Sequence, residues 1–171
     1  MQLLELLARS QALEKRAAAM YRAFAAADLN DPDLAALWTH LAAEEDAHAS
    51  SIEAALASLD ARGGTLIAID GCEKALADIA ERLRSGEGLP ADATADRRFT
   101  AAIDLELSEL ETLRRLAVGA SGGGPVVPPE ERHLQRLGET AMKRSSNGHV
   151  RLAAAVLLAR QRLAADVAAR W

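Results

Sequence analysis

Several features are scarce in this 171-residue chain, and each scarcity excludes a class of protein. The single cysteine, Cys72, cannot form an internal disulfide or a cysteine-based zinc or iron centre. No apolar run reaches the roughly 18 residues of a membrane span, and residues 1–10 lack the features of a signal peptide. Basic residues are not clustered and the net charge is −5, which argues against nucleic-acid binding. We therefore expect a soluble, cytoplasmic protein that does not associate with a membrane.

The composition favours helices. Aromatic residues make up 3% of the chain and β-branched residues are sparse, while Ala and Leu supply most of the 50% that is hydrophobic. Ala and Leu are strong helix formers. A chain of this length is typical of one domain with a sizeable core, so we expect a single all-α domain over residues 1–171.

Apolar residues spaced three and four apart predict four long helices, at about residues 3–27, 32–59, 93–118 and 129–170. The turn before Pro32 is short, which makes the first two helices antiparallel neighbours. Residues 63–92 suit a long crossover between the second and third helices, with a short extra helix at 72–84. Residues 145–148 are poor helix formers and predict a kink or a local break before His149. The long end of the last helix is expected to project or to pack on a partner.

Each predicted helix carries a polar residue within its apolar face. The second helix shows this best, because Glu45 and His48 share a stripe with Trp38 and Ile52. Burying a charged group without a partner is costly, and a bound metal ion is the most economical compensation. The polar residues on the apolar faces are Glu14, Glu45, His48, Glu106, Glu109 and His149.

The two halves of the chain form a weak repeat: Glu14 precedes Glu45-x-x-His48, and Glu106 precedes Ser146-x-x-His149. Four helices that supply such groups can form a dinuclear carboxylate site. Ser146 stands where a second Glu-x-x-His pair needs its glutamate, and a serine hydroxyl is a poor ligand for a divalent metal. The remaining four carboxylates still balance two divalent ions, so a full two-metal site and an asymmetric site both stay open.

The motifs resemble those of a known family. The motifs in question are Ala12-Leu-Glu14 with Tyr21 seven residues later, Leu41-Ala-Ala-Glu-Glu45-x-x-His48, and Ala102-Ile-Asp-Leu-Glu106 with Glu109. The chain resembles the ferritin-like superfamily, and within it is most similar to the rubrerythrin-type diiron domain. This resemblance implies a ferritin-like antiparallel four-helix bundle with metal ligands Glu14, Glu45, His48, Glu106, Glu109 and His149. It also implies that Tyr21 can donate a hydrogen bond to a ligand carboxylate.

The residues outside the proposed ligand set are interpreted as surface, boundary or packing residues. Glu44 flanks the apolar face of its helix and is expected to be solvated, and His40 lies off that face. His133 falls in the first turn of the last predicted helix and is interpreted as a surface or boundary residue. Cys72 is interpreted as a small packed residue.

The resemblance implies a non-haem diiron oxidoreductase that reduces hydrogen peroxide or dioxygen while ferrous iron is oxidised. Because cysteine pairs are lacking, electrons would come from a separate donor protein or from the iron itself. Two alternatives remain: iron oxidation and storage in a closed oligomer of the ferritin kind, or a degenerate domain with one metal or none and a structural or interaction role. Iron is the expected metal, as two ions or one, with manganese or zinc as substitutes. A homo-oligomer, a dimer or larger, is expected.

Overall fold

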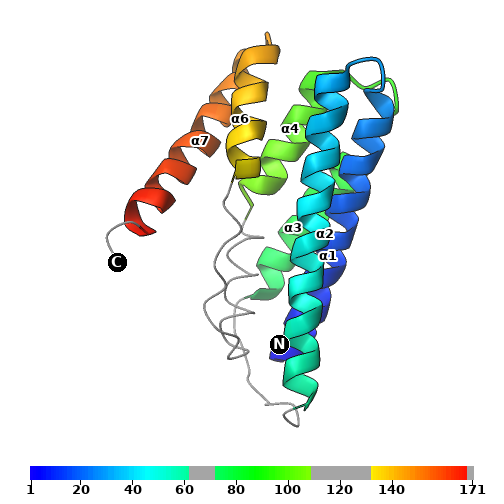
Figure 1. The fold of residues 1–171 in the computed structure, drawn as a ribbon, viewed down its shortest axis with the longest axis vertical. Coiled ribbons are helices and arrows are strands. Elements are labelled where there is room, and N and C mark those ends of the chain that lie inside the picture. The colour runs from blue at the N-terminus through cyan, green and yellow to red at the C-terminus, as the bar shows by residue number, and fades with distance from the viewer. Residues whose placement is uncertain (62–71, 109–131, 169–171) are drawn as a thin grey trace.

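The computed structural model describes residues 1–61, 72–108 and 132–168, which form six helices and no β-strand (Figure 1). The all-α prediction is therefore confirmed for the described part of the chain. The helices are α1 (Leu3–Ala27), α2 (Pro32–Ala61), α3 (Cys72–Glu87), α4 (Ala95–Glu106), α6 (Arg132–Arg144) and α7 (Gly148–Ala168).

Among the described helices, α1 and α2 form the most extensive packing contact and run antiparallel (Figure 1). Asp31 caps α2, because its Oδ1 accepts a hydrogen bond from the backbone N–H of Leu34 at 3.2 Å, and Pro32 occupies the first helical position. Trp38 is fully buried at the centre of an aromatic group, stacked on Tyr21 with ring centroids 6.2 Å apart. Its indole Nε1 donates to Asp28 Oδ2 at 2.7 Å, which satisfies the only polar atom of the ring.

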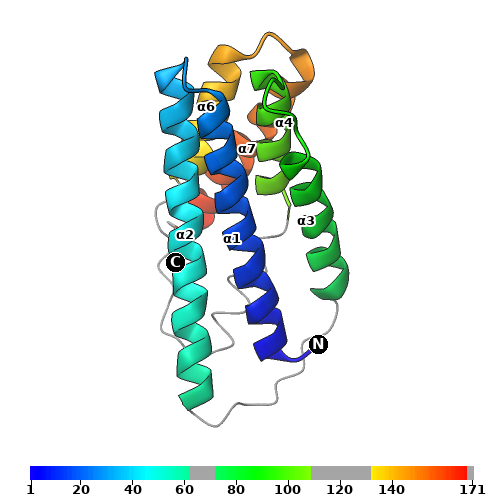
Figure 2. The same cartoon turned by 90° about the vertical axis from the view of Figure 1, so that its right-hand side faces the viewer.

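The predicted crossover contains α3, which returns the chain to the end of the molecule where α1 ends, and α4 then runs back down (Figure 2). Arg16 holds α3 against α1 through two hydrogen bonds to the Glu87 carboxylate, at 2.9 and 2.8 Å. The short helix expected at 72–84 is present and extends to Glu87. The third long helix, expected at 93–118, is α4 in its first part, and α4 ends at Glu106, because Leu107 and Ser108 are no longer helical. Residues 109–131 lie outside the described part.

The helix expected at 129–170 is two helices in its described part, because the kink or local break expected before His149 is a full break. Residues 145–147 leave the helical conformation, with Asn147 N–H donating to Ser145 Oγ at 3.0 Å. Asn147 Oδ1 then accepts the N–H of His149 at 2.9 Å and caps α7. These short side chains compete with helical hydrogen bonds, so the chain reverses and α7 packs back on α6 and α4.

Within the described residues, none of the helices combines the length and the apolar content needed to cross a membrane.

Gly138 allows α6 and α7 to approach closely, so a larger side chain at this position should destabilise the fold. A Cβ atom at this position would lie 2.7 Å from Leu158 Cγ and 2.8 Å from Leu158 Cδ2, so Gly138→Ala forces Leu158 to move. We expect a loss of about 1–3 kcal/mol in the free energy of unfolding, partly offset by alanine's better helix propensity. Urea unfolding followed by circular dichroism measures it.

Gly148→Ala is the matched control, because a Cβ atom at Gly148 meets nothing within 4 Å. Its free energy of unfolding should stay within about 0.5 kcal/mol of the wild type or rise slightly. An equal loss in both variants would contradict the packing role assigned to Gly138.

Candidate metal centre

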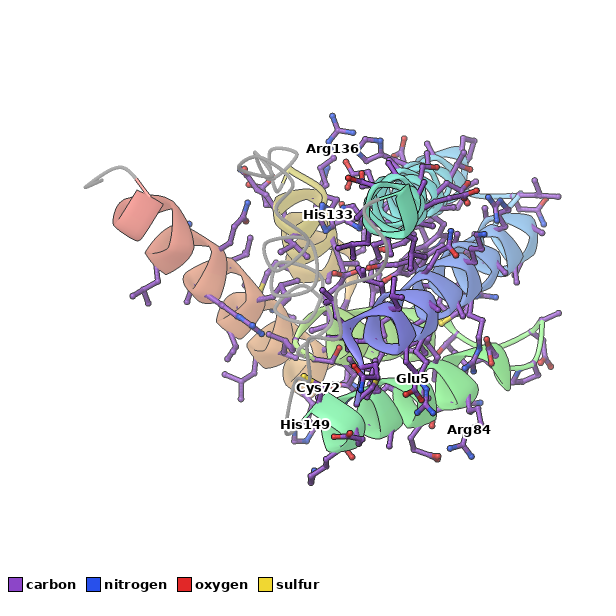
Figure 3. The ribbon with its side chains drawn as sticks, turned by 90° about the horizontal axis from the view of Figure 1, so that it is seen from below. Glu5, Cys72, Arg84, His133, Arg136 and His149 are labelled. Atoms are coloured by element: carbon purple, nitrogen blue, oxygen red, sulfur yellow. The ribbon has the colours of Figure 1, made fainter. Side chains whose placement is uncertain are left out.

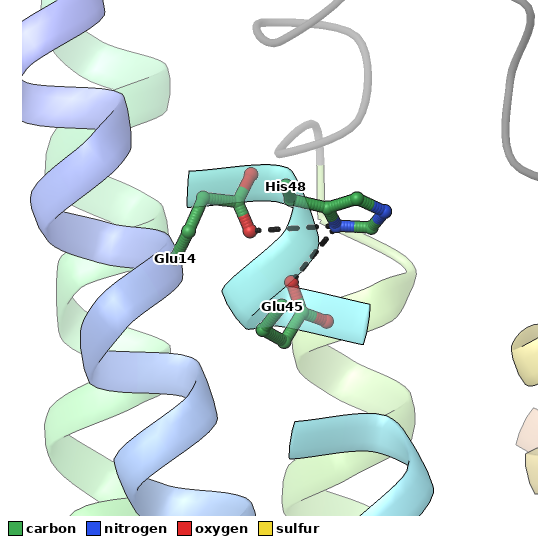
Figure 4. A group of neighbouring side chains, drawn as sticks. All are labelled: Glu14, Glu45 and His48. Atoms are coloured by element: carbon green, nitrogen blue, oxygen red, sulfur yellow. Dashed lines mark hydrogen bonds and ion pairs between the residues drawn. The ribbon is translucent and has the colours of Figure 1, made fainter. Parts of the chain in front are cut away.

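Glu14 of α1 and Glu45 and His48 of α2 converge between the two helices (Figure 4). Their exposed fractions are 1%, 2% and 5%, and one ligand atom from each lies within 4.8 Å of the others. His48 Nδ1 lies 3.1 Å from Glu45 Oε2 and 3.7 Å from Glu14 Oε2. Glu45 and His48 meet because residues three apart share one face of a helix.

The environment of these three side chains favours a cation. Burial raises the pKa of Glu45 well above its usual range; the hydrogen bond with His48 opposes this rise, and the negative charges of Glu106 and Glu14 add to it. His48 Nε2 is buried, and no described residue hydrogen-bonds to it. Two carboxylates and an imidazole are a suitable ligand set for iron, manganese or zinc, and a divalent ion would offset the cost of burying them. The residues therefore fit a metal ion.

Glu106, at the end of α4, faces the same region and is held by Tyr21 of α1. The Tyr21 hydroxyl donates to Glu106 Oε1 at 2.7 Å. Burial raises the pKa of Tyr21 well above its usual value, and the charges of Glu106 and Glu45 raise it further. The hydroxyl thus stays protonated and orients the Glu106 carboxylate, so the hydrogen bond to a carboxylate that the resemblance implied for Tyr21 is present.

His133, in the first turn of α6, reaches the centre from a third side. It is 5% exposed, its ring centroid is 5.9 Å from that of His48, and its Nε2 lies 3.7 Å from Glu106 Oε2. Its Nδ1 lies 2.6 Å from Glu44 Oε2. The interpretation of His133 as a surface or boundary residue was wrong, because the first turn of α6 faces α2.

The charge on His133 compensates neighbouring carboxylates. Burial opposes this charge, but the interactions with Glu106 and Glu44 outweigh burial and raise the His133 pKa to about 11. Burial also works against ionisation of Glu44, yet His133 and His40 lower the Glu44 pKa on balance. Glu44 is half-buried and contacts both histidines, with its Oε1 3.0 Å from His40 Nε2, so the expectation that it is solvated was wrong. At neutral pH His133 is an imidazolium in the metal-free site.

The structure does not bring all predicted ligands together. Glu14, Glu45 and His48 meet, and Glu106 lies beside them through Tyr21 and His133. His149 is exposed at the start of α7, well apart from His133 (Figure 3). Ser146 is exposed in the connection between α6 and α7, so the Ser146-x-x-His149 half of the repeat is not at the centre. Glu109 lies outside the described residues.

A sequence signal for His133 was present and was missed. Glu130-Glu-Arg-His133 has the same Glu-x-x-His spacing as Glu45 and His48. Two prolines directly precede it, and their position marked it as the start of a helix rather than as a motif. Glu130 itself lies outside the described residues, so only its spacing in the sequence speaks for it.

No family model matches the chain, and no curated protein or solved structure matches it either. What supports a functional conclusion is therefore the geometry of the centre. That geometry is a buried Glu-Glu-His group that can bind a metal, with a hydrogen-bonded tyrosine and carboxylate and a histidine cation beside it.

The raised pKa of His133 predicts how the metal-free protein responds to pH. An imidazolium with a folded-state pKa near 11 stabilises the fold fully below the unfolded value of 6.5, and this stabilisation is lost as the pH rises toward 11. In the presence of a chelator, the melting temperature should fall over this window, with a loss of about 1.5–3 kcal/mol, typical of a hydrogen bond to a charged group. Calorimetry across the window measures the fall.

His133→Gln should flatten that dependence, whereas His149→Gln, at an exposed position, should keep the wild-type profile. If both variants keep the wild-type profile, His133 does not carry the charge assigned to it.

Proposed function

We propose that this chain is a ferritin-like metal protein of the rubrerythrin type, which binds ferrous iron and reduces hydrogen peroxide or dioxygen. The observation that carries the proposal is the convergence of Glu14, Glu45 and His48 in a buried site. The helix order supports it, since α3 lies in the crossover between the α1–α2 pair and the elements that bring Glu106 and His133. Oxidation of two ferrous ions supplies the two electrons that, with two protons, reduce hydrogen peroxide to two water molecules.

The first half of the site consists of Glu14, Glu45 and His48. For the second half we propose Glu106 and His133, together with Glu130 on the strength of its spacing three residues before His133. His133 can serve as a ligand only after it loses a proton, so metal binding in this half must release protons. Tyr21 keeps the Glu106 carboxylate oriented while the charge around it changes.

A second candidate is a metal-free structural domain, and one observation favours it. The His133 imidazolium already compensates Glu106 and Glu44, so part of the buried charge is balanced without a metal. The two candidates differ in what ferrous or manganous ions do to the folded protein, because a ligand that binds only the folded state raises its stability.

Under anaerobic conditions, ferrous or manganous ions should raise the melting temperature of the wild type. The rise corresponds to about 2.7 kcal/mol when the free metal is 100 times its dissociation constant. Glu45→Ala combined with His48→Ala should abolish the rise, because it removes two of the three converging ligands. Glu53→Gln on the exposed side of α2 is the control and should keep the rise. Unchanged melting of the wild type with metal would favour the structural candidate.

The stoichiometry of an anaerobic ferrous titration tests the second half of the site. We expect about two ions per chain for the wild type, the number that a dinuclear carboxylate site holds. Glu130→Gln should lower the count toward one. Ser146→Glu should change nothing, because Ser146 is exposed in the connection between α6 and α7. A count of one in the wild type that Glu130→Gln leaves unchanged would show that the second half does not bind metal.

A further inference from the structure

Helix α7 carries two apolar faces on opposite sides. The inner face holds Val150, Ala154 and Leu157, which are at most 3% exposed where α7 packs on α4 and α6. The outer face holds Leu152, Val156 and Leu163, which are 65%, 50% and 67% exposed. Exposed Ala159 lies between Val156 and Leu163, so these residues are spaced four, three and four apart and form one stripe. A helix at the surface of a domain normally has a polar outer face.

The stripe is an exposed apolar surface, of the kind at which proteins associate. Three of the five large hydrophobic side chains that are exposed in the described part of the chain lie on it. Figure 1 shows α7 leaning away from the α1–α2 pair, with one side turned outward. A contiguous exposed apolar surface of this kind marks a site of association in a soluble protein.

The charges beside the stripe define the chemistry of the partner. Arg151, Arg160 and Arg162 are exposed beside it, and α7 has no acidic residue among 148–163, the part whose side chains are described. Over residues 132–163, the chain has seven Lys or Arg residues and one acidic residue. The rest of the chain must therefore be strongly acidic, because the whole carries a net charge of −5. One molecule thus has a basic apolar helix and an acidic remainder.

We propose that the outer face of α7 docks on the acidic part, residues 1–108, of a second copy of this chain. Leu152, Val156 and Leu163 provide the apolar contact, while the arginines pair with carboxylates at its edge. Direct pairing of two α7 helices through residues 148–163 is disfavoured, because this stretch carries three arginines and no acidic residue. The contact is separate from the metal centre, since none of the stripe residues belongs to the centre.

Sedimentation velocity of the full chain tests the contact. The wild type should self-associate, and rising salt should weaken the association because the edge is charged. Leu152→Glu combined with Leu163→Glu should weaken the association by roughly tenfold or more, since two apolar anchors are lost. Leu29→Glu is the matched control: Leu29 is 73% exposed and lies in the turn between α1 and α2, away from α7. Unchanged circular dichroism in each variant shows that folding is retained.

Arg162→Lys places a lysine at the edge of the stripe without changing its charge, and it leaves the Arg160 hydrogen bond to the Leu107 carbonyl intact. A zero-length carbodiimide links lysine to carboxylates, so Lys at this position should couple to Asp or Glu residues within 1–108. A mixture of unlabelled and 15N-labelled protein identifies links between two copies by mass spectrometry. The links should disappear in the background of the two leucine substitutions.

Three results would overturn the proposal. One is a wild type that stays monomeric at the highest soluble concentration, and another is self-association that both leucine substitutions leave intact. The third is wild-type protein that binds vesicles of phosphatidylserine and phosphatidylcholine without self-association, which would assign the face to an anionic membrane surface. Glu45→Ala with His48→Ala should self-associate as the wild type does, so a failed metal site and a failed contact give different results.

Discussion

The burial of Glu14, Glu45 and His48 between α1 and α2 is the constraint on which the rest of the structure depends. Two carboxylates removed from water destabilise the fold unless protons, hydrogen bonds or cations compensate them. The raised pKa of Glu45 shows that the compensation within α1 and α2 is incomplete. Of the elements that follow, α4 adds a further carboxylate, Glu106, which accepts a hydrogen bond from the Tyr21 hydroxyl, and α6 brings the His133 cation, which compensates it. The packing of these helices around α1 and α2 is thus also an electrostatic requirement.

The buried carboxylates are compensated to different degrees in the two halves of the proposed site, and this difference affects how each half would bind a metal. The half formed by Glu14, Glu45 and His48 has a ligand set in which burial raises the pKa of Glu45. The half around Glu106 has His133, which holds a proton through the neutral range because two carboxylates flank it. A metal ion in the first half would compensate unbalanced charge, whereas in the proposed second half it would have to displace a proton from His133. The two halves should differ in affinity even where their residue types match.

Local patterns predicted what depends on local interactions. The expected bounds 3–27 match α1, and the turn at Asp31 and Pro32 was correct, because caps and hydrophobic periodicity act within a few residues. Glu14, Glu45 and His48 were found for the same reason. His149 was predicted at the centre because one long helix was assumed, but the caps from Ser145 and Asn147 end α6 and expose His149. His133 was missed because its burial depends on where α6 meets α2, a tertiary contact that periodicity does not encode.

The α6–α7 pair connects the metal centre to the proposed contact between copies. His133 holds the start of α6 at the centre. Arg144 holds its other end through Asp31, just before α2, at 2.9 Å and through Asp33, in the first turn of α2, at 2.7 Å. Gly138 lets α7 lie close against this anchored helix, so α7 is positioned by α6. The outer face of α7 therefore depends on the same helix that delivers His133. A second copy bound to α7 would hold α6 in place and favour the arrangement in which His133 contacts Glu106, because binding stabilises the conformation that it requires.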